Sequence, residues 1–355
     1  MEKNTRTAAD TAAINNAAPM KDRIGEYLIP RIQDEFLFDE LSPGFLERAG
    51  IADILTDVPV PIRKSDLSQG MTTVNIARNM AYIIGCDINF RYRDAYIAYI
   101  DRMFQGQFVR PLLGEGTDLA SHDDYESAAI LFRAAILIDP DNGDAYYCYG
   151  RACRDAYENG EGEEYVGKFK AESLEAFEKL TMKSPDFDMG YYFLGFGYIN
   201  LGLYIKAKLT WDRFMELSKE GELRAEIRGY LDKLEEPCRI EKGYNSVLAG
   251  RYSEGLAILE PYKEDERFNQ WWPLWYYIGV AYKGLEDANS AEESLLQGLR
   301  YAPSSVDIMK ELVEIYDAFG DREKRDKYAK KIEIVKKNAE LDREERKAAQ
   351  MPGLS

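Results

Sequence analysis

Apolar residues recur with the spacing of an α-helix along most of this chain. Thr72 or Thr73 can cap a helix whose apolar residues over 74–84 fall on one face, and Gly85 is suited to end it. No alternating pattern is long enough to predict a strand, and the run 58–61, with two prolines in four residues, is expected to be a connector. A second helix is indicated by large residues at Tyr92, Tyr96, Tyr99 and Met103. The sequence therefore predicts an all-α fold.

From about residue 111 the helical pattern becomes a repeat. Three segments place a small residue, a large residue and a proline at constant spacing, and they end at Pro140, Pro185 and Pro303. A second spaced set, with an aromatic residue, a glycine and a tyrosine, occurs over 191–198 and 275–282. Small, large and turn-forming positions thus recur together, which is typical of stacked helical units.

This pattern resembles the tetratricopeptide repeat (TPR), a helix–turn–helix unit of 34 residues. The resemblance covers about 111–337 as five or six units, and it implies a right-handed superhelical solenoid of helical hairpins. The prolines end the second helices because proline cannot continue a helix. A small residue midway along the first helix lets the two helices of a hairpin approach closely, and this position is held by Gly150, Gly195, Gly243 and Gly279.

The units are not uniform. Pro140 and Pro185 are 45 residues apart, eleven more than one repeat, so we expect a polar loop or a helix extension near 157–167. An added helical stretch is expected at 222–236, and the charge-dense last unit is expected to cap the array. The predicted organisation begins with a disordered tail at 1–20 and an N-terminal helical region of unknown role at 21–110. The repeat array follows at 111–337, and a charged C-terminal helix extension with a tail at 338–355.

Composition narrows the classes of partner. The 355 residues carry 46 Lys+Arg and 63 Asp+Glu, a net charge of −17, which argues against binding to a nucleic-acid backbone. No apolar run approaches the roughly 20 residues of a membrane span, and residues 1–20 do not resemble a signal peptide. Four cysteines are too few for a disulfide framework, so a reducing, cytoplasmic location is expected. We expect a protein or peptide partner, no nucleic acid and no membrane, and the sequence leaves the oligomeric state open.

Catalytic chemistry finds little support in the residues present. The single histidine, His122, excludes most histidine-dependent mechanisms, and 122–124 is expected to form the turn inside a hairpin. Residues 139–144 resemble a calcium loop only superficially, because the required glycine and carboxylate positions do not match. Cys148 and Cys153 do not converge on a metal ion, and buried, inert thiols are expected. The sequence thus predicts a non-enzymatic protein without a cofactor or a metal ion.

The TPR resemblance also implies candidate binding residues. In this family the ligand-facing residues of the first helices line a concave face, where they would form a groove that binds a peptide or a helix through aromatic contacts. The alternative is that these aromatics pack against one another or against an N-terminal segment, and that the arginines are simply solvated. Carried over position by position, the candidates are Tyr147, Arg151, Arg154, Met189, Tyr192, Phe196, Asn200, Tyr244, Tyr276 and Lys283.

Three functions compete at this point. The leading hypothesis is a non-catalytic interaction scaffold or adaptor, and it rests partly on analogy of fold. The second is a peptide-sensing transcriptional or signalling regulator with an N-terminal effector domain, in which the 74–84 helix would offer Asn75, Arg78 and Asn79 to DNA. The third is an enzyme with its site in 21–110, for which the available residues are Asp87, Arg91, Tyr92 and Arg93. Nothing in the sequence links those four residues to a reaction.

Overall fold

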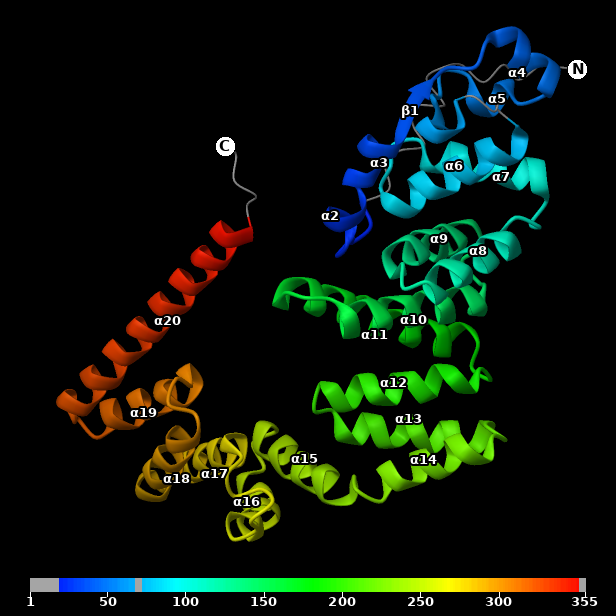
Figure 1. The fold of residues 1–355 in the computed structure, drawn as a ribbon. Helices are drawn as coiled ribbons and strands as arrows, with labels where there is room; N and C mark the ends of the chain where they lie inside the picture. The colour runs from blue at the N-terminus through cyan, green and yellow to red at the C-terminus, as the bar shows by residue number, and fades with distance from the viewer. Residues whose placement is uncertain (1–18, 68–71, 351–355) are drawn as a thin grey trace, which may run out of the picture. The chain divides into compact units, whose positions relative to one another are not determined.

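The computed structural model describes residues 19–67 and 72–350. Within them the prediction of an all-α fold is confirmed, because the chain forms consecutive helices and one short two-stranded sheet (Figure 1). The predicted tail over 1–20 lies almost wholly outside the described residues. No helix among the described residues combines the length and the apolar character that crossing a bilayer requires.

The chain divides into two compact units. The first consists of the residues up to 198 together with 210–220, and the second consists of 199–209 and the residues from 221 onward. The N-terminal part of the first unit is built from short elements: α2 (Gly25–Leu28), α3 (Pro30–Glu35), β1 (Phe36–Asp39), α4 (Pro43–Ala49), α5 (Ala52–Leu55), β2 (Val60–Arg63), the 3-10 helix η2 (Lys64–Asp66), α6 (Thr73–Cys86) and α7 (Arg93–Phe104).

The two strands correct the expectation that the chain contains none. β1 pairs with β2 in antiparallel fashion, with Phe36 opposite Arg63 and Asp39 opposite Val60. The run 58–61, expected as a connector, therefore leads into a strand. Each strand is four residues long, too short for an alternating pattern to show in the sequence. Pro61 is tolerated because each strand of a two-stranded ribbon has a free edge where no ladder donor is needed.

The repeats form helical hairpins in series, as predicted. In the first hairpins α8 packs on α9 and α10 packs on α11, and the same holds for the pairs α15 and α16, α17 and α18, and α19 and α20 (Figure 1). The bounds of the helices are α8 (Val109–Ser121), α9 (Tyr125–Ile138), α10 (Gly143–Asn159), α11 (Glu163–Lys183), α12 (Asp188–Asn200), α13 (Tyr204–Leu217), α14 (Gly221–Leu231), α15 (Glu235–Leu248), α16 (Tyr252–Leu259), the 3-10 helix η3 (Glu260–Lys263), α17 (Trp272–Gly284), α18 (Ala288–Tyr301), α19 (Val306–Ala318) and α20 (Arg322–Gln350).

A left-handed residue turns the chain inside several of these hairpins. Gly250 between α15 and α16 and Gly320 between α19 and α20 have φ of 76° and 71°, which glycine adopts without strain. Asp123 takes this place between α8 and α9 with φ of 65°. His122 ends α8, and the Asp124 side chain caps α9 by accepting a hydrogen bond from the backbone of Ser127. The prediction that 122–124 forms a hairpin turn is confirmed.

Close helix approach occurs at the predicted small positions. A Cβ atom on Gly195 would lie 2.0 Å from Nε1 of Trp211, so only glycine fits there. Each of the four glycines meets a large residue of its second helix: Gly150 meets Phe177, Gly195 meets Trp211, Gly243 meets Leu259, and Gly279 meets Leu295. The two members are sixteen residues apart in the last three pairs and 27 apart in the first. The eleven extra residues therefore lie inside the α10–α11 hairpin.

The two predicted insertions take helical form. α10 and α11 have 17 and 21 residues, and they are separated only by the turn 160–162. The extra length near 157–167 is thus a helix extension around a short turn. The stretch 222–236 forms α14, which ends at Leu231, and its last two residues already belong to α15.

The hydrophobic core of the first unit continues across residue 110. One cluster of buried side chains runs from Ile24 in the N-terminal part to Ala176 in α11, and α6 packs directly on α9. The packing therefore has no break at 110, and the functional division predicted there stays a prediction. In the second unit, α20 packs on α19 through Tyr328, Ile332 and Val335, and the expectation that this last unit caps the array stays a prediction.

Candidate functional site

The predicted binding residues fall into two groups, one in each unit. The larger group lies on α10 and α12 of the first unit and consists of Tyr147, Arg151, Arg154, Met189, Tyr192 and Phe196. All six side chains are half-buried, so each contributes surface. The second unit holds Asn200, Tyr244, Tyr276 and Lys283. We call the first group the aromatic–arginine face.

The aromatic–arginine face is organised around Phe193, a buried residue of α12. The Phe193 ring stacks on Phe177 at a centroid distance of 5.2 Å. Tyr192 meets it edge-on at 5.0 Å, and Tyr147 lies 6.1 Å from it. Tyr192 in turn contacts Phe196 at 5.2 Å. The rings are therefore held in place by one another, and part of the self-packing alternative describes the structure correctly.

The two arginines also pack on Phe193. The guanidinium carbon of Arg151 lies 4.8 Å from the ring centroid and that of Arg154 lies 5.1 Å from it, within the range of a cation–π interaction. Arg151 donates a hydrogen bond to the Tyr147 hydroxyl at 3.2 Å, and Arg154 donates one to Glu158 at 2.7 Å. The expectation of simply solvated arginines is thus replaced by guanidinium groups fixed over an aromatic ring.

Two charged side chains on this surface, Arg154 and Asp155, have shifted pKa values. Burial works against the charged form of Arg154, but the hydrogen bond to Glu158 and the nearby charges of Glu158 and Asp155 together outweigh it, so the pKa of Arg154 is raised. Burial also raises the pKa of Asp155 above its ordinary value, although the charges of Arg151 and Arg154 oppose this shift. The Arg151 Nε–H is buried and has no hydrogen-bond partner.

The second unit brings three of its four candidates together through other residues. Tyr244 stacks on Tyr277 at 4.8 Å, and Tyr276 meets the same ring edge-on at 5.2 Å. Lys283 is paired with Glu311 and with Glu314, so its charge is compensated within the chain. The fourth candidate, Asn200, is exposed at the end of α12.

The N-terminal segment packs on second helices, whereas the candidate residues lie on first helices. Asp22 forms an ion pair with Arg133 of α9 at 2.7 Å. Arg23 pairs with Glu172 of α11 at 2.8 Å, and Tyr27 lies 6.0 Å from Phe169 of the same helix. This segment therefore belongs to the side of the hairpins formed by α9 and α11.

Sequence reasoning missed the residue at the centre of the face. Phe193 follows Tyr192 directly and points inward, so a list of ligand-facing family positions passes over it. Phe177 is the large residue of the repeat segment that ends at Pro185. The available signal was the combination of an aromatic run at 191–193 with that position, because an inward aromatic needs a large partner on the neighbouring helix.

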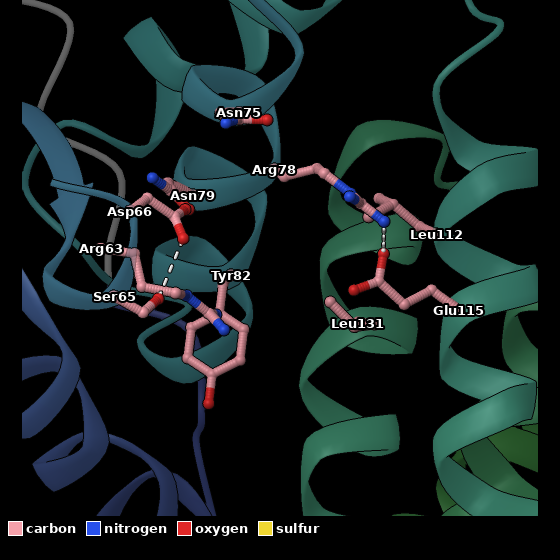
Figure 2. Close-up of a pocket in the computed structure, with 10 residues that line it drawn as sticks. All are labelled: Arg63, Ser65, Asp66, Asn75, Arg78, Asn79, Tyr82, Leu112, Glu115 and Leu131. Atoms are coloured by element: carbon pink, nitrogen blue, oxygen red, sulfur yellow. Dashed lines mark hydrogen bonds and ion pairs between the residues drawn. The ribbon is translucent and has the colours of Figure 1, made fainter. Parts of the chain in front are cut away.

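The residues of the DNA-binding hypothesis do not form an exposed reading surface. Asn75, Arg78 and Asn79 line a cavity of about 220 Å³ in the first unit (Figure 2). Asn79 is buried and donates a hydrogen bond to the carbonyl oxygen of Pro61 at 3.2 Å. Arg78 is paired with Glu115 of α8 at 2.5 Å. Asn79 is thus engaged inside the protein, whereas Arg78 is engaged in an ion pair at the surface.

The residues of the enzyme hypothesis serve the turn between α6 and α7. Asp87 accepts a hydrogen bond from the backbone of Asn89 at 2.9 Å, and Arg93 donates one to the carbonyl oxygen of Ile88 at 3.0 Å. The guanidinium of Arg91 lies 5.3 Å from the Tyr92 ring. None of the four lines the cavity just described. They give the enzyme hypothesis no common site.

None of the four cysteines forms a disulfide bond. Cys86, Cys153 and Cys238 are buried, and Cys148 is half-buried. Burial, with a smaller contribution from Asp144, raises the pKa of Cys148 to about 11. Burial raises the pKa of Cys86 to about 12. Because the thiolate is the reactive form, these thiols are weak nucleophiles near neutral pH.

We therefore expect Cys148 to be alkylated slowly by iodoacetamide at about pH 8 and about tenfold faster for each further pH unit up to about 10. The thiolate fraction rises tenfold per unit below the raised pKa of Cys148. Site-resolved mass spectrometry of the folded protein measures the rate, and the guanidinium-unfolded chain is the control. Equal rates for Cys148 in the folded and unfolded chains would contradict this prediction.

Comparisons with known proteins identify no family. No family model matches the chain, and no curated protein matches it. Among solved structures it is similar to YrrB, described as a TPR protein with an unusual peptide-binding site (18% identity, 60% of this chain, 96% of that chain, TM-score 0.31). It is also similar to the TPR domain of P58(IPK) (11% identity, 86% of each chain, TM-score 0.44) and to MamA from Desulfovibrio magneticus RS-1 (15%, 55% and 96%, TM-score 0.30). At such low TM-scores these similarities carry neither a family nor a function to this chain.

Proposed function

We propose that this protein is a non-catalytic interaction scaffold or adaptor that binds a segment of a partner protein through the aromatic–arginine face. The observation that supports this most is that four half-buried side chains from two first helices, Tyr147, Arg151, Arg154 and Tyr192, pack on the single ring of Phe193. Tyrosine and arginine are the residue types that most often dominate binding energy at protein interfaces. The function follows from this surface and from the array of hairpins that carries it.

Pre-organisation is the physical advantage of this arrangement. Tyr147, Tyr192 and Phe196 are restrained by ring contacts, so they lose little conformational entropy when a partner binds. Arg151 presents a buried Nε–H without a partner, and an acceptor on a bound segment would complete it. The partner we propose therefore carries apolar or aromatic side chains and at least one hydrogen-bond acceptor, such as a carboxylate.

The proposal also assigns a role to the candidate residues of the second unit. Tyr244 and Tyr276 of the second unit are proposed as a further contact, with Lys283 contributing little because two carboxylates already pair with it.

We propose that the protein works without a cofactor, does not bind nucleic acid and is cytoplasmic. The charge of −17 and the four cysteines, none of which forms a disulfide bond, support these points.

Removing two side chains of the face should abolish partner binding while leaving the fold intact. We expect the Tyr192→Ala and Arg154→Ala double variant to recover its main partner from native lysate at about a tenth of the unaltered level or less, because two central contacts are lost. Affinity capture with quantitative mass spectrometry measures the recovery.

The matched control removes the same residue types from second helices, as Tyr301→Ala with Arg213→Ala, two positions that are partly exposed. This control should recover the partner normally. Circular dichroism and thermal unfolding verify that both double variants are folded. If the face variant is folded and recovers the same proteins in the same amounts as the control, the proposed face is wrong.

A further inference from the structure

A polar face of α6 is turned toward neighbouring elements. Asn75, Arg78, Asn79 and Tyr82 follow one another at helical spacing and line the 220 Å³ cavity, which Figure 2 shows between α6, η2 and α8. Burying polar groups costs free energy unless each finds a partner. Within this chain Asn79 donates to the carbonyl oxygen of Pro61, Tyr82 donates to Glu35, and Arg78 pairs with Glu115. The groups of the lining that still need a partner therefore come from the segment 63–66.

The charges around this α6 pocket balance. Arg63 and Arg78 contribute two positive charges, and Asp66 and Glu115 contribute two negative ones. Arg78 reaches across from α6 to Glu115 of α8, as the dashed line in Figure 2 shows. Asp66 accepts only a hydrogen bond from the neighbouring Ser65 hydroxyl at 2.9 Å, so most of its acceptor capacity is unused among the described residues.

One donor in the pocket lining is left without a partner. The guanidinium of Arg63 packs against the rings of both Phe36 and Tyr82, with its central carbon 5.0 Å and 4.7 Å from their centroids. Its Nη2 is 3.6 Å from a carboxylate oxygen of Glu35, and its Nε–H is buried without any hydrogen bond. The rings hold the guanidinium in place, so an acceptor must come to it.

We propose that the α6 pocket binds a small zwitterion, a free α-amino acid. The carboxylate of the ligand accepts from Arg63 and from the amides of Asn75 and Asn79. Its ammonium group donates to Asp66, and its side chain lies against Leu112 and Leu131. This site is independent of the aromatic–arginine face and its proposed partner.

The pocket selects against other small ions. A phosphate dianion would meet the carboxylates of Asp66 and Glu115, and like charges at short distance repel. A simple amine would leave the Arg63 donor unsatisfied. The pocket volume of about 220 Å³ is large enough for a molecule of the size of an amino acid.

Calorimetric titration of the full chain tests this proposal. The probes are the twenty common L-amino acids, added singly, together with inorganic phosphate. We expect at least one amino acid to bind with a dissociation constant on the order of 1 mM or tighter. Its analogues lacking the ammonium group or the carboxylate should bind at least about tenfold more weakly, and phosphate should not bind.

Two variants locate the site. Asp66→Asn should weaken binding of that amino acid by about tenfold or more, because the neutral amide is a poor partner for an ammonium group. Asp53→Asn makes the same chemical change at an exposed carboxylate paired with Arg102, away from the pocket, and should leave binding unchanged. Absence of binding by all twenty amino acids would overturn the proposal. It would also be overturned if the unaltered chain and Asp66→Asn bound the amino acid with equal affinity, or if the unaltered chain bound the amino acid and its analogue without the ammonium group equally well.

Discussion

Replacing Gly85 by alanine should destabilise the first unit by about 3 kcal/mol, because a Cβ atom there has no room. It would lie 2.1 Å from the carbonyl oxygen of Ile130 and 2.9 Å from the carbonyl carbon of the same residue. These are backbone atoms of α9, which cannot turn aside as the end of a flexible side chain can. α6 and α9 must therefore move apart across the core. Urea denaturation followed by circular dichroism measures the loss.

The matched control for Gly85 is Gly114, an exposed glycine inside α8 of the same unit. An added Cβ at Gly114 has no atom within 4 Å. Alanine there should stabilise the unit by roughly 0.5–1 kcal/mol, because it restricts the unfolded chain and favours the helix. If the two alanine variants unfold at the same denaturant concentration, the close approach of α6 and α9 is wrong.

Breaking the ion pair between Asp22 and Arg133 should cost about 3–5 kcal/mol of unfolding free energy. The side chains are only 12% and 5% exposed, so Asp22→Asn leaves the arginine charge buried without compensation. Nη1 of Arg133 already lacks a hydrogen-bond partner, so the loss of the Asp22 carboxylate adds to the free-energy cost of burying this guanidinium. The thermal and urea unfolding transitions of the first unit report the change.

Two further variants separate charge burial from simple loss of contact. Glu26→Gln removes a carboxylate that pairs with Lys168 but is 55% exposed, and it should cost less than about 1 kcal/mol. Combining Asp22→Ala with Arg133→Met removes both buried charges and should recover much of the stability lost in Asp22→Asn. A double variant less stable than Asp22→Asn would show that the N-terminal segment is held mainly by packing and not by this pair.

Much of the candidate site was predictable because it follows a repeat. The aromatic–arginine face lies on α10 and α12, where the family spacing predicts ligand-facing residues; four of the six predicted residues pack on one ring there, and their role in binding stays a prediction. The hub, Phe193, could not be assigned in this way, since its inward direction depends on Phe177 sixteen positions earlier on another helix. The arginines were placed correctly along the chain, but their stacking on that ring was not foreseeable from spacing.

The N-terminal part was predicted least well, and the reason is sequence distance. Asp22 meets Arg133, and Arg23 meets Glu172, across more than a hundred residues without any periodic signal. The strands β1 and β2 are too short to show alternation. The α6 pocket combines β2, η2, α6, α8 and α9, and no local pattern marks residues from five elements as neighbours.

The sequence by itself determined the helices, the hairpin turns and the places where helices touch, because these depend on local spacing. A glycine sixteen residues before a large residue is enough to set a hairpin's register, as Gly195 with Trp211 and Gly279 with Leu295 illustrate. Only the tertiary structure decided which side of the hairpins the N-terminal segment covers, which arginines are held on an aromatic ring and where a polar helix face meets a cavity. These features arise from contacts between distant segments, whose free energy is set by shape and charge in three dimensions.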